Sequence, residues 1–193
     1  MPKVSEEHRQ ARRAQILAAA RRRFAANGFH MTSMDDVIAE AGLSAGALYR
    51  YFPSKNALIL ACAEDALDTV TSVVTELAAD PKGRTPGQTV AWILSRSLAT
   101  LGADNSRLGM LAWTESLRNP ELHQLLAERY RAIRDAMRQA ARAWTDDDAE
   151  ADAVAKTMLS VVLGFLVQRA ILGDVAEADL TAGLDARMTR DVR

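Results

Sequence analysis

The stretch that decides the fold runs from Thr32 to Lys55 and reads TSMDDVIAEAGLSAGALYRYFPSK. Thr32 and Ser33 each stand three residues before an aspartate, a spacing typical of the cap that opens a helix. Gly42 follows the apolar positions of this segment and is the residue type that most often ends a helix. The pattern therefore predicts a helix of about two turns that ends at Ala41–Gly42.

A second short helix follows almost at once. Ser44 comes only two residues after Gly42 and is placed to cap a helix over 45–52. Pro53 ends that helix, because proline disfavours helical geometry in the residue before it. Two short helices joined by a tight turn form a helix-turn-helix pattern.

The flanking sequence is also helical. Apolar residues recur at intervals of three and four, alanine is abundant, and alternating β-branched residues are nearly absent. The expected fold is all-α, with an N-terminal helix-turn-helix domain over 1–55 and a larger helical domain over 56–193. The expected helices outside the central pair span 7–27, a segment capped by Ser54 that stops before Pro81, 88–102, 105–118, 120–144, 148–173 and 177–189.

Composition and motifs exclude several classes of protein. The chain has 193 residues, of which 49% are hydrophobic and 25% charged, so one sizeable core can be buried. Its single cysteine allows no internal disulfide, the charged N-terminus lacks a signal region, and the apolar run 158–167 is too short to span a bilayer. We therefore expect a cytoplasmic protein with no membrane segment. No metal-ligand spacing, phosphate-binding glycine loop or catalytic motif is present, so neither a cofactor nor an enzyme is predicted.

Charge is unevenly distributed along the chain. Residues 1–55 carry nine Lys and Arg against five acids, a net charge of +4, whereas the remainder carries −5. A basic N-terminal segment followed by an acidic remainder is typical of a small polyanion-binding module attached to a regulatory or oligomerising domain.

The helix over 45–52 has the residue types of a DNA-reading helix. Small residues at its start, Ala45, Gly46 and Ala47, keep the tip thin enough to enter a major groove. The hydroxyl and cationic groups expected to meet phosphates or base edges are those of Tyr49, Arg50, Tyr51 and Lys55. Thr32 and the cap at Ser33 offer further hydroxyl and N–H groups for phosphates.

From Arg13 to Leu60 the chain resembles the DNA-binding domain of the TetR family of bacterial transcriptional regulators. The matching positions include Phe24, Gly28-Phe29, the run from Thr32 to Ala39 and the run from Ala41 to Phe52. The resemblance implies phosphate contacts from Thr32, Ser44, Tyr49, Tyr51 and Lys55, with Ala45, Gly46, Ala47 and Arg50 facing bases. It also implies a homodimer, with one head in each major groove, whose C-terminal helices form both the dimer seam and an effector cavity.

The body of the chain fits those expectations. Helix 120–144 carries one apolar stripe and helix 148–173 is apolar on most sides, so we expect these two helices to pair with a second copy of the chain. An apolar or aromatic small molecule is the expected effector. The candidate contacts for it are Cys62, Trp92, Arg96, Met110, Trp113, Thr114, Tyr130, Phe165 and Gln168.

Two questions stay open at the level of sequence. The arginines at 12, 13 and 21–23 are either a solvated helix face or contacts to DNA. The favoured function is a ligand-responsive DNA-binding repressor. The alternative is a helical small-molecule carrier or scaffold that does not bind DNA.

Overall fold

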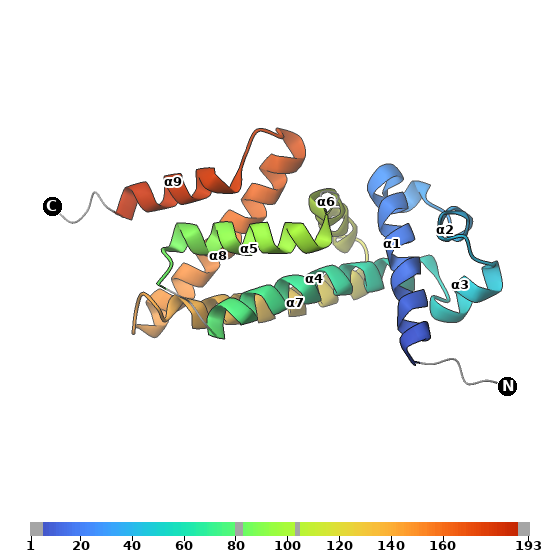
Figure 1. Ribbon diagram of the computed structural model, residues 1–193, viewed down its shortest axis with the longest axis horizontal. Helices are drawn as coiled ribbons and strands as arrows, with labels where there is room; N and C mark the ends of the chain where they lie inside the picture. The colour runs from blue at the N-terminus through green and yellow to red at the C-terminus, as the bar shows by residue number, and fades with distance from the viewer. Residues whose placement is uncertain (1–5, 80–82, 103–104, 189–193) are drawn as a thin grey trace. The chain divides into compact units, whose positions relative to one another are not determined.

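A computed structural model describes residues 6–79, 83–102 and 105–188. Every regular element in these ranges is an α-helix, which confirms the all-α prediction (Figure 1). The helices are α1 (Glu6–Met31), α2 (Met34–Ala41), α3 (Ala45–Tyr51), α4 (Lys55–Ala79), α5 (Pro86–Leu101), α6 (Asn105–Ser116), α7 (Pro120–Ala141), α8 (Asp148–Ile171) and α9 (Glu177–Met188).

The caps of the helix-turn-helix are formed as the sequence predicts. Ser33 caps α2, because its hydroxyl oxygen accepts from the Asp36 N–H at 3.1 Å and its own N–H donates to the Asp36 carboxylate at 2.7 Å. Gly42 ends α2 in the left-handed conformation, with φ 64° and ψ 37°. Ser44 then caps α3 by accepting from the Ala47 N–H at 3.3 Å.

The chain divides into two compact units. The first contains α1 to α3, α4 through Asp65, and residues 107–125 of α6 and α7; the second contains the rest of the described chain. The first unit thus extends beyond residue 55 along the chain, and the domain boundary expected there stays a prediction. Helix α4 is continuous across Asp65, and a segment distant in sequence joins the first unit.

The core of the first unit lies between α1 and the helix-turn-helix. Leu48 on α3, Val37 on α2 and Phe24 on α1 are all buried, and the Phe24 and Phe29 rings meet edge to face at 5.0 Å between centroids. Gly28 interrupts α1 with φ 77°, a conformation that side chains with a Cβ rarely adopt. The predicted stop at Asn27–Gly28 is therefore a kink, and the chain turns helically again as far as Met31.

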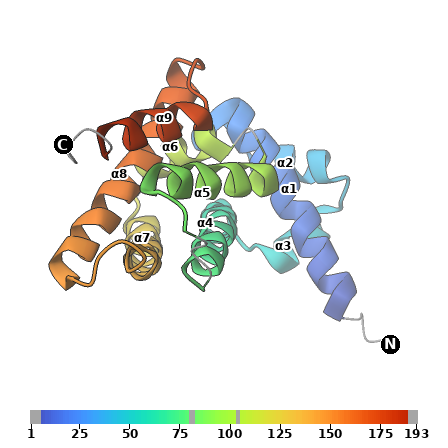
Figure 2. The ribbon, with the colours of Figure 1, turned by 60° about the vertical axis from the view of Figure 1, so that its left-hand side comes forward.

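The second unit has its own apolar core, supplied by α4, α5, α7 and α8. Helix α7 lies beside α4, and an ion pair of 3.0 Å between Arg129 and Asp68 links them (Figure 2). The buried members are Val74, Leu77, Val90, Ile93, Leu94, Ile133, Ala136, Met137, Ala140, Ala155, Met158, Val162 and Phe165.

Helix α9 is held against the start of α5. The Asp185 carboxylate accepts from the Thr85 hydroxyl at 2.6 Å and from the Gly87 N–H at 3.1 Å, so it adds negative charge at a helix N-terminus. A Cβ at Gly87 would lie 2.6 Å from that carboxylate, so a larger residue here would displace Asp185. The two helices are therefore joined by a specific polar contact as well as by apolar packing.

Ion pairs join the helices of the first unit. Glu40 on α2 accepts a hydrogen bond from Arg22 at 2.7 Å and forms an ion pair with Arg23 at 3.0 Å, which ties α2 to α1. Arg21 pairs with Asp65 on α4. The hydrogen bond from Arg22 and the charge of Arg23 hold the pKa of the Glu40 carboxyl below its ordinary value.

The lowered pKa of Glu40 predicts a pH-dependent stability. A carboxyl whose pKa is lower in the folded state contributes stability above its unfolded pKa, about 4.3 for glutamate, and loses it as pH falls through the folded value. Glu40→Gln should therefore lower the free energy of unfolding at pH 7 and make it less sensitive to pH below about 4.3. Urea unfolding at pH 7, 5 and 3.5 measures this. Glu7→Gln, at an exposed acid of α1, is the control, and equal pH profiles for the two variants would contradict the prediction.

Candidate nucleic-acid interface

Helix α3 turns one side to the core and the other to solvent. Leu48 has no exposed surface and is the buried residue of this helix, whereas the Tyr49 side chain is 45% exposed. Arg50, Ala45 and Gly46 are also exposed. The side expected to meet DNA is therefore open to a partner at these four positions.

Two further residues of the expected surface are partly covered. Ala47 and Tyr51 are half-buried. Positions two apart on a helix lie about 200° around its axis, which explains why Tyr49 and Tyr51 differ in exposure. The expectation that at least one of these tyrosines is exposed is met by Tyr49.

The smallness of Gly46 is not required by the fold. Its backbone conformation is one that any residue adopts in a helix, and a Cβ added there would meet nothing within 4 Å. Glycine in a helix costs about 1 kcal/mol relative to alanine. The chain's own packing therefore does not account for glycine at this exposed tip.

Thr32 and Lys55 have roles that sequence reasoning missed. The Thr32 side chain is fully buried, and its hydroxyl donates to the Gly28 carbonyl at 2.8 Å, with the Arg23 carbonyl at 3.2 Å. The hydroxyl faces the end of α1, so in this conformation it does not reach a phosphate as expected. We therefore leave Thr32 out of the proposed contact surface.

Lys55 is only partly available. Its ammonium donates to the carbonyls of Phe29 at 3.1 Å and of Thr32 at 3.2 Å, so it neutralises the C-terminal end of α1. An ammonium has three donors, and one remains for a phosphate. No local sequence signal reveals this cap, because the carbonyls lie more than twenty residues away.

The turn between α6 and α7 belongs to the first unit and contacts the end of α1. Glu115 accepts from Arg118 at 2.8 Å and lies 3.0 Å from the His30 imidazole. Burial raises the pKa of the Glu115 carboxyl, but Arg118 and then His30 lower it by more. This turn also contacts the start of α4, where Asn119 donates to Asn56 at 2.6 Å.

The expected effector contacts are divided between the two units. Cys62, Met110, Trp113 and Thr114 belong to the first unit, and Trp92, Arg96, Tyr130, Phe165 and Gln168 to the second. Several of these side chains are buried in the chain's own core or form hydrogen bonds within their own helix.

Cys62 and Phe165 are buried, and burial raises the pKa of the Cys62 thiol to about 12. The Thr114 hydroxyl donates to the Met110 carbonyl at 3.0 Å. Trp92 is half-buried, with the Arg84 guanidinium 5.2 Å from its ring centroid. Apolar periodicity alone does not separate such core residues from ligand contacts.

Comparison with known proteins shows which family has this arrangement of helices. Residues 16–62 match the family described as bacterial regulatory proteins, tetR family, and residues 86–190 match the family described as BetI-type transcriptional repressor, C-terminal. The chain belongs to the TetR family. The resemblance inferred from the helix-turn-helix residues is thereby confirmed, and so is the N-terminal helix-turn-helix domain with its larger helical C-terminal domain.

Curated relatives have the same type of function. The HTH-type transcriptional repressor Rv1474c of Mycobacterium tuberculosis is 31% identical over 178 residues, which cover 90% of each chain. The uncharacterized regulator YfiR of Bacillus subtilis is 43% identical over 67 residues, 35% of this chain and 33% of that protein. These relatives are DNA-binding transcriptional regulators and not enzymes.

Solved structures share the fold over nearly the whole length. A regulator from Saccharomonospora viridis, determined in complex with choline, has a TM-score of 0.73 at 21% identity and covers 94% of this chain and 97% of its own. FadR from Bacillus subtilis, determined with stearoyl-CoA, has a TM-score of 0.73 at 15% identity, covering 94% and 100%. At these identities the likeness supports the fold.

Proposed function

We propose that this TetR-family chain is a cytoplasmic repressor that binds a pseudo-palindromic operator as a homodimer and releases it when a small molecule binds. The observation that carries the proposal is the outward side of α3, where Tyr49 and Arg50 stand exposed beside the thin tip at Gly46. Arg50 alone on this side can make a bidentate bond to guanine. Ser33, Ser44, Tyr49, Tyr51 and the remaining donor of Lys55 are the proposed phosphate contacts, and Ala45, Gly46 and Ala47 face bases.

Helix α8 supports the proposed dimer. It is 24 residues long and apolar enough to cross a membrane by length and composition, with 22% of its most apolar window buried. However, the uncharged stretch between Lys156 and Arg169 holds 12 residues, about 18 Å of helix against a hydrocarbon core of about 30 Å. A second copy of the chain is therefore the better cover for its apolar side.

The outward sides of α8 and α9 carry small residues, which are typical of closely packed helices. Exposed Thr157 and Ser160 share a stripe of α8 with Gly164, and the helix ends with Ile171, which is 65% exposed. A Cβ at Gly164 or at Gly183 of α9 would meet nothing within 4 Å, so the chain's own fold does not need glycine at either position. Closely packed neighbouring helices would need it.

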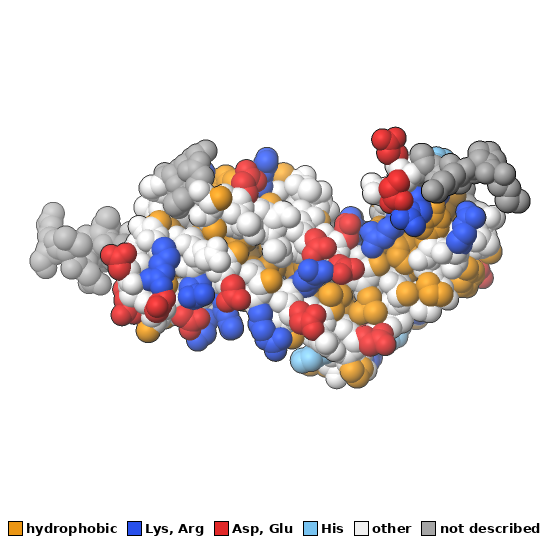
Figure 3. All heavy atoms as spheres, turned by 90° about the horizontal axis from the view of Figure 1, so that it is seen from below, with side chains coloured by type: hydrophobic (Ala, Val, Ile, Leu, Met, Phe, Trp, Pro, Cys, Tyr) orange, Lys and Arg blue, Asp and Glu red, His pale blue; other side chains and the backbone are white. Residues whose placement is uncertain are grey.

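Helix α7 contributes less to this proposed seam than its apolar stripe suggested. The stripe is used in the chain's own core, and the outward positions include Glu128, Arg131 and Asp135. Figure 3 shows side chains of both charges intermixed on one face of the second unit. The dimer proposal therefore depends mainly on α8, with α9 in place of much of α7.

We propose an apolar or aromatic effector, held by the C-terminal helices. Half-buried Trp92 and Tyr130 are the aromatic candidates in the second unit. A ligand that binds the chain better in a conformation with displaced heads would shift the equilibrium away from DNA. Stearoyl-CoA, bound to one structural neighbour, tests the apolar class, and choline, bound to another, tests a cation that aromatic faces accommodate.

A mobility-shift assay tests this function. The probe is a duplex that the wild-type chain recovers from a random-sequence library, titrated with choline and stearoyl-CoA in separate arms. Arg50→Ala should weaken binding by about 1–3 kcal/mol per head, about 5- to 150-fold, because alanine cannot hydrogen-bond a base edge. Arg131→Ala removes the same charge from the outer side of α7 and should leave affinity nearly unchanged. Recovery of no preferred duplex, or equal affinity for Arg50→Ala and wild type, would overturn the proposal.

A further inference from the structure

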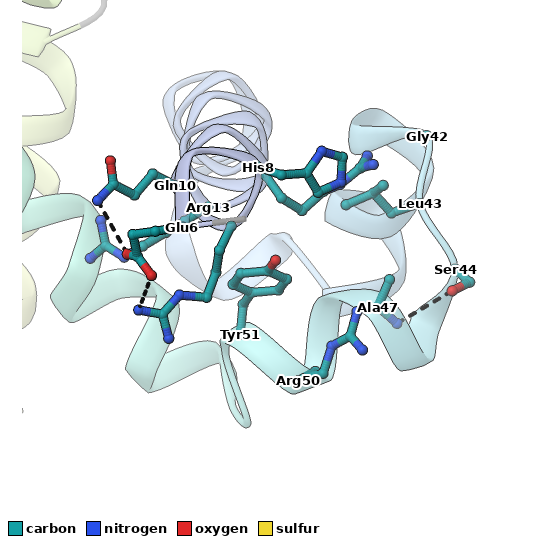
Figure 4. A pocket seen from close by; sticks show the side chains of 12 residues that line it. Glu6, His8, Gln10, Arg13, Gly42, Leu43, Ser44, Ala47, Arg50 and Tyr51 are labelled. Atoms are coloured by element: carbon teal, nitrogen blue, oxygen red, sulfur yellow. Dashed lines mark hydrogen bonds and ion pairs between the residues drawn. The ribbon is translucent and has the colours of Figure 1, made fainter. Parts of the chain in front are cut away.

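A basic cleft lies beside α3, between the first turns of α1 and the turn that joins α2 to α3 (Figure 4). Its volume is about 1000 Å³. Among the described residues, its lining holds one carboxylate, that of Glu6, and four arginines: Arg9, Arg12, Arg13 and Arg50. Positive charge is therefore concentrated next to the helix that faces DNA.

The arginines of α1 fall into two groups. Arg21, Arg22 and Arg23 are held by carboxylates of α4 and α2, so they join helices within the first unit. Arg12 instead donates to the neutral Gln15 amide oxygen at 2.9 Å, and Arg13 lies over the Phe52 ring at 5.8 Å. Among the described residues no carboxylate pairs with either of them, so their charge is left for a partner.

Arg13 is well placed to bind a phosphate. A guanidinium that stacks on an aromatic ring keeps its N–H edges free, and those edges match phosphate oxygens. Figure 4 shows the Tyr51 ring standing in the cleft between α1 and α3, which adds a phenol donor to the same space. Arg9, in contrast, is already paired with Glu6 at 2.7 Å.

The cleft is continuous with the surface proposed to contact DNA. Ser44, Ala47 and Arg50 belong to the cleft lining and also to α3 or its cap. A DNA strand that borders the groove entered by α3 would pass the mouth of the cleft with its phosphates toward it. A duplex therefore fits the position of the charges better than a separate small anion does.

We propose that this cleft holds the sugar–phosphate backbone of the operator strand beside α3, with Arg12 and Arg13 as its phosphate-binding side chains. This inference rests on the proposed function. The two arginines supply affinity that does not depend on base sequence, because phosphates carry no sequence information. They thereby complement α3, whose tip offers few groups to read bases.

The test compares two double variants of the same helix. Arg12→Gln/Arg13→Gln removes the cleft charges, whereas Arg22→Gln/Arg23→Gln removes two charges that both pair with Glu40 outside the cleft. The probe is the duplex selected by the wild-type chain, prepared with neutral methylphosphonate groups at successive positions. Thermal unfolding confirms that each variant is folded, and Arg131→Gln/Arg134→Gln on α7 replaces the control if the Glu40 pair is needed for folding.

The cleft variant should lose sensitivity to methylphosphonate at a specific position in each half-site and keep it elsewhere. Its slope of log affinity against log salt should fall by about 0.9 for each phosphate that a head no longer binds, and the control's slope should match that of the wild type. An unchanged slope and pattern in Arg12→Gln/Arg13→Gln, with normal wild-type binding, would overturn this inference alone. Failure of the wild-type chain to bind any duplex would overturn the proposed function as well.

Discussion

Gly164→Arg is expected to separate the proposed dimer into monomers and to weaken operator binding by about 10²- to 10⁴-fold. Linking two heads makes the second binding event intramolecular, and that gain disappears when the subunits separate. The single chain should accept the change, because a Cβ at Gly164 meets nothing within 4 Å and arginine favours helices more than glycine does. Two buried guanidinium groups facing each other across a twofold axis would oppose association.

Sedimentation velocity gives the mass of Gly164→Arg, and the mobility-shift assay gives its affinity for the selected duplex. Gln139→Arg is the matched control, since it adds the same charge at an exposed position of α7 away from the proposed seam. Thermal unfolding of the two variants should be similar. A dimeric Gly164→Arg with wild-type affinity would show that α8 does not form the seam.

The local features of the fold were predictable because neighbouring residues determine them. The caps at Ser33 and Ser44 and the turn at Gly42 depend on groups within three or four residues, and all three are formed as expected. Helix periodicity likewise placed the start of each described helix close to its observed residue. The stop at Gly28 was located correctly, but the helical turn that continues after it to Met31 was not predicted.

Contacts between distant residues were not predictable in the same way. Arg22 and Arg23 look the same in the sequence as Arg12 and Arg13, and only the folded chain shows that the first two pair with Glu40. The buried hydroxyl of Thr32 is a similar case, since a resemblance to a family assigns a position but not the direction of a side chain.

The effector contacts were the hardest to predict, because buried aromatic and sulfur-containing side chains serve equally well in cores and in ligand cavities. Phe165 lies in the core of the second unit and Cys62 is buried in the first. The residues proposed to face DNA differ from these, since an exposed tyrosine or arginine beside a glycine tip is not explained by the chain's own core.

Leu48→Ala is expected to lower the free energy of unfolding by about 2–5 kcal/mol, the range for truncating a fully buried leucine. The free energy of DNA binding should become less favourable by a similar amount. Helix α3 has seven residues, and helices of that length are unstable in water without tertiary packing. Because Leu48 is the buried residue of α3, its truncation removes the main apolar anchor of the helix that carries Tyr49 and Arg50.

Leu48→Met separates the packing role from any direct role in binding. Methionine nearly conserves the volume of leucine, and such exchanges cost less than about 1.5 kcal/mol. Urea unfolding and the mobility-shift assay should therefore rank both properties in the order wild type, Leu48→Met, Leu48→Ala. If Leu48→Ala unfolds at the same urea concentration as wild type and binds the duplex equally well, then α3 is held in place by something other than this side chain. In that case the presentation of Tyr49 and Arg50 to DNA would need a different structural basis.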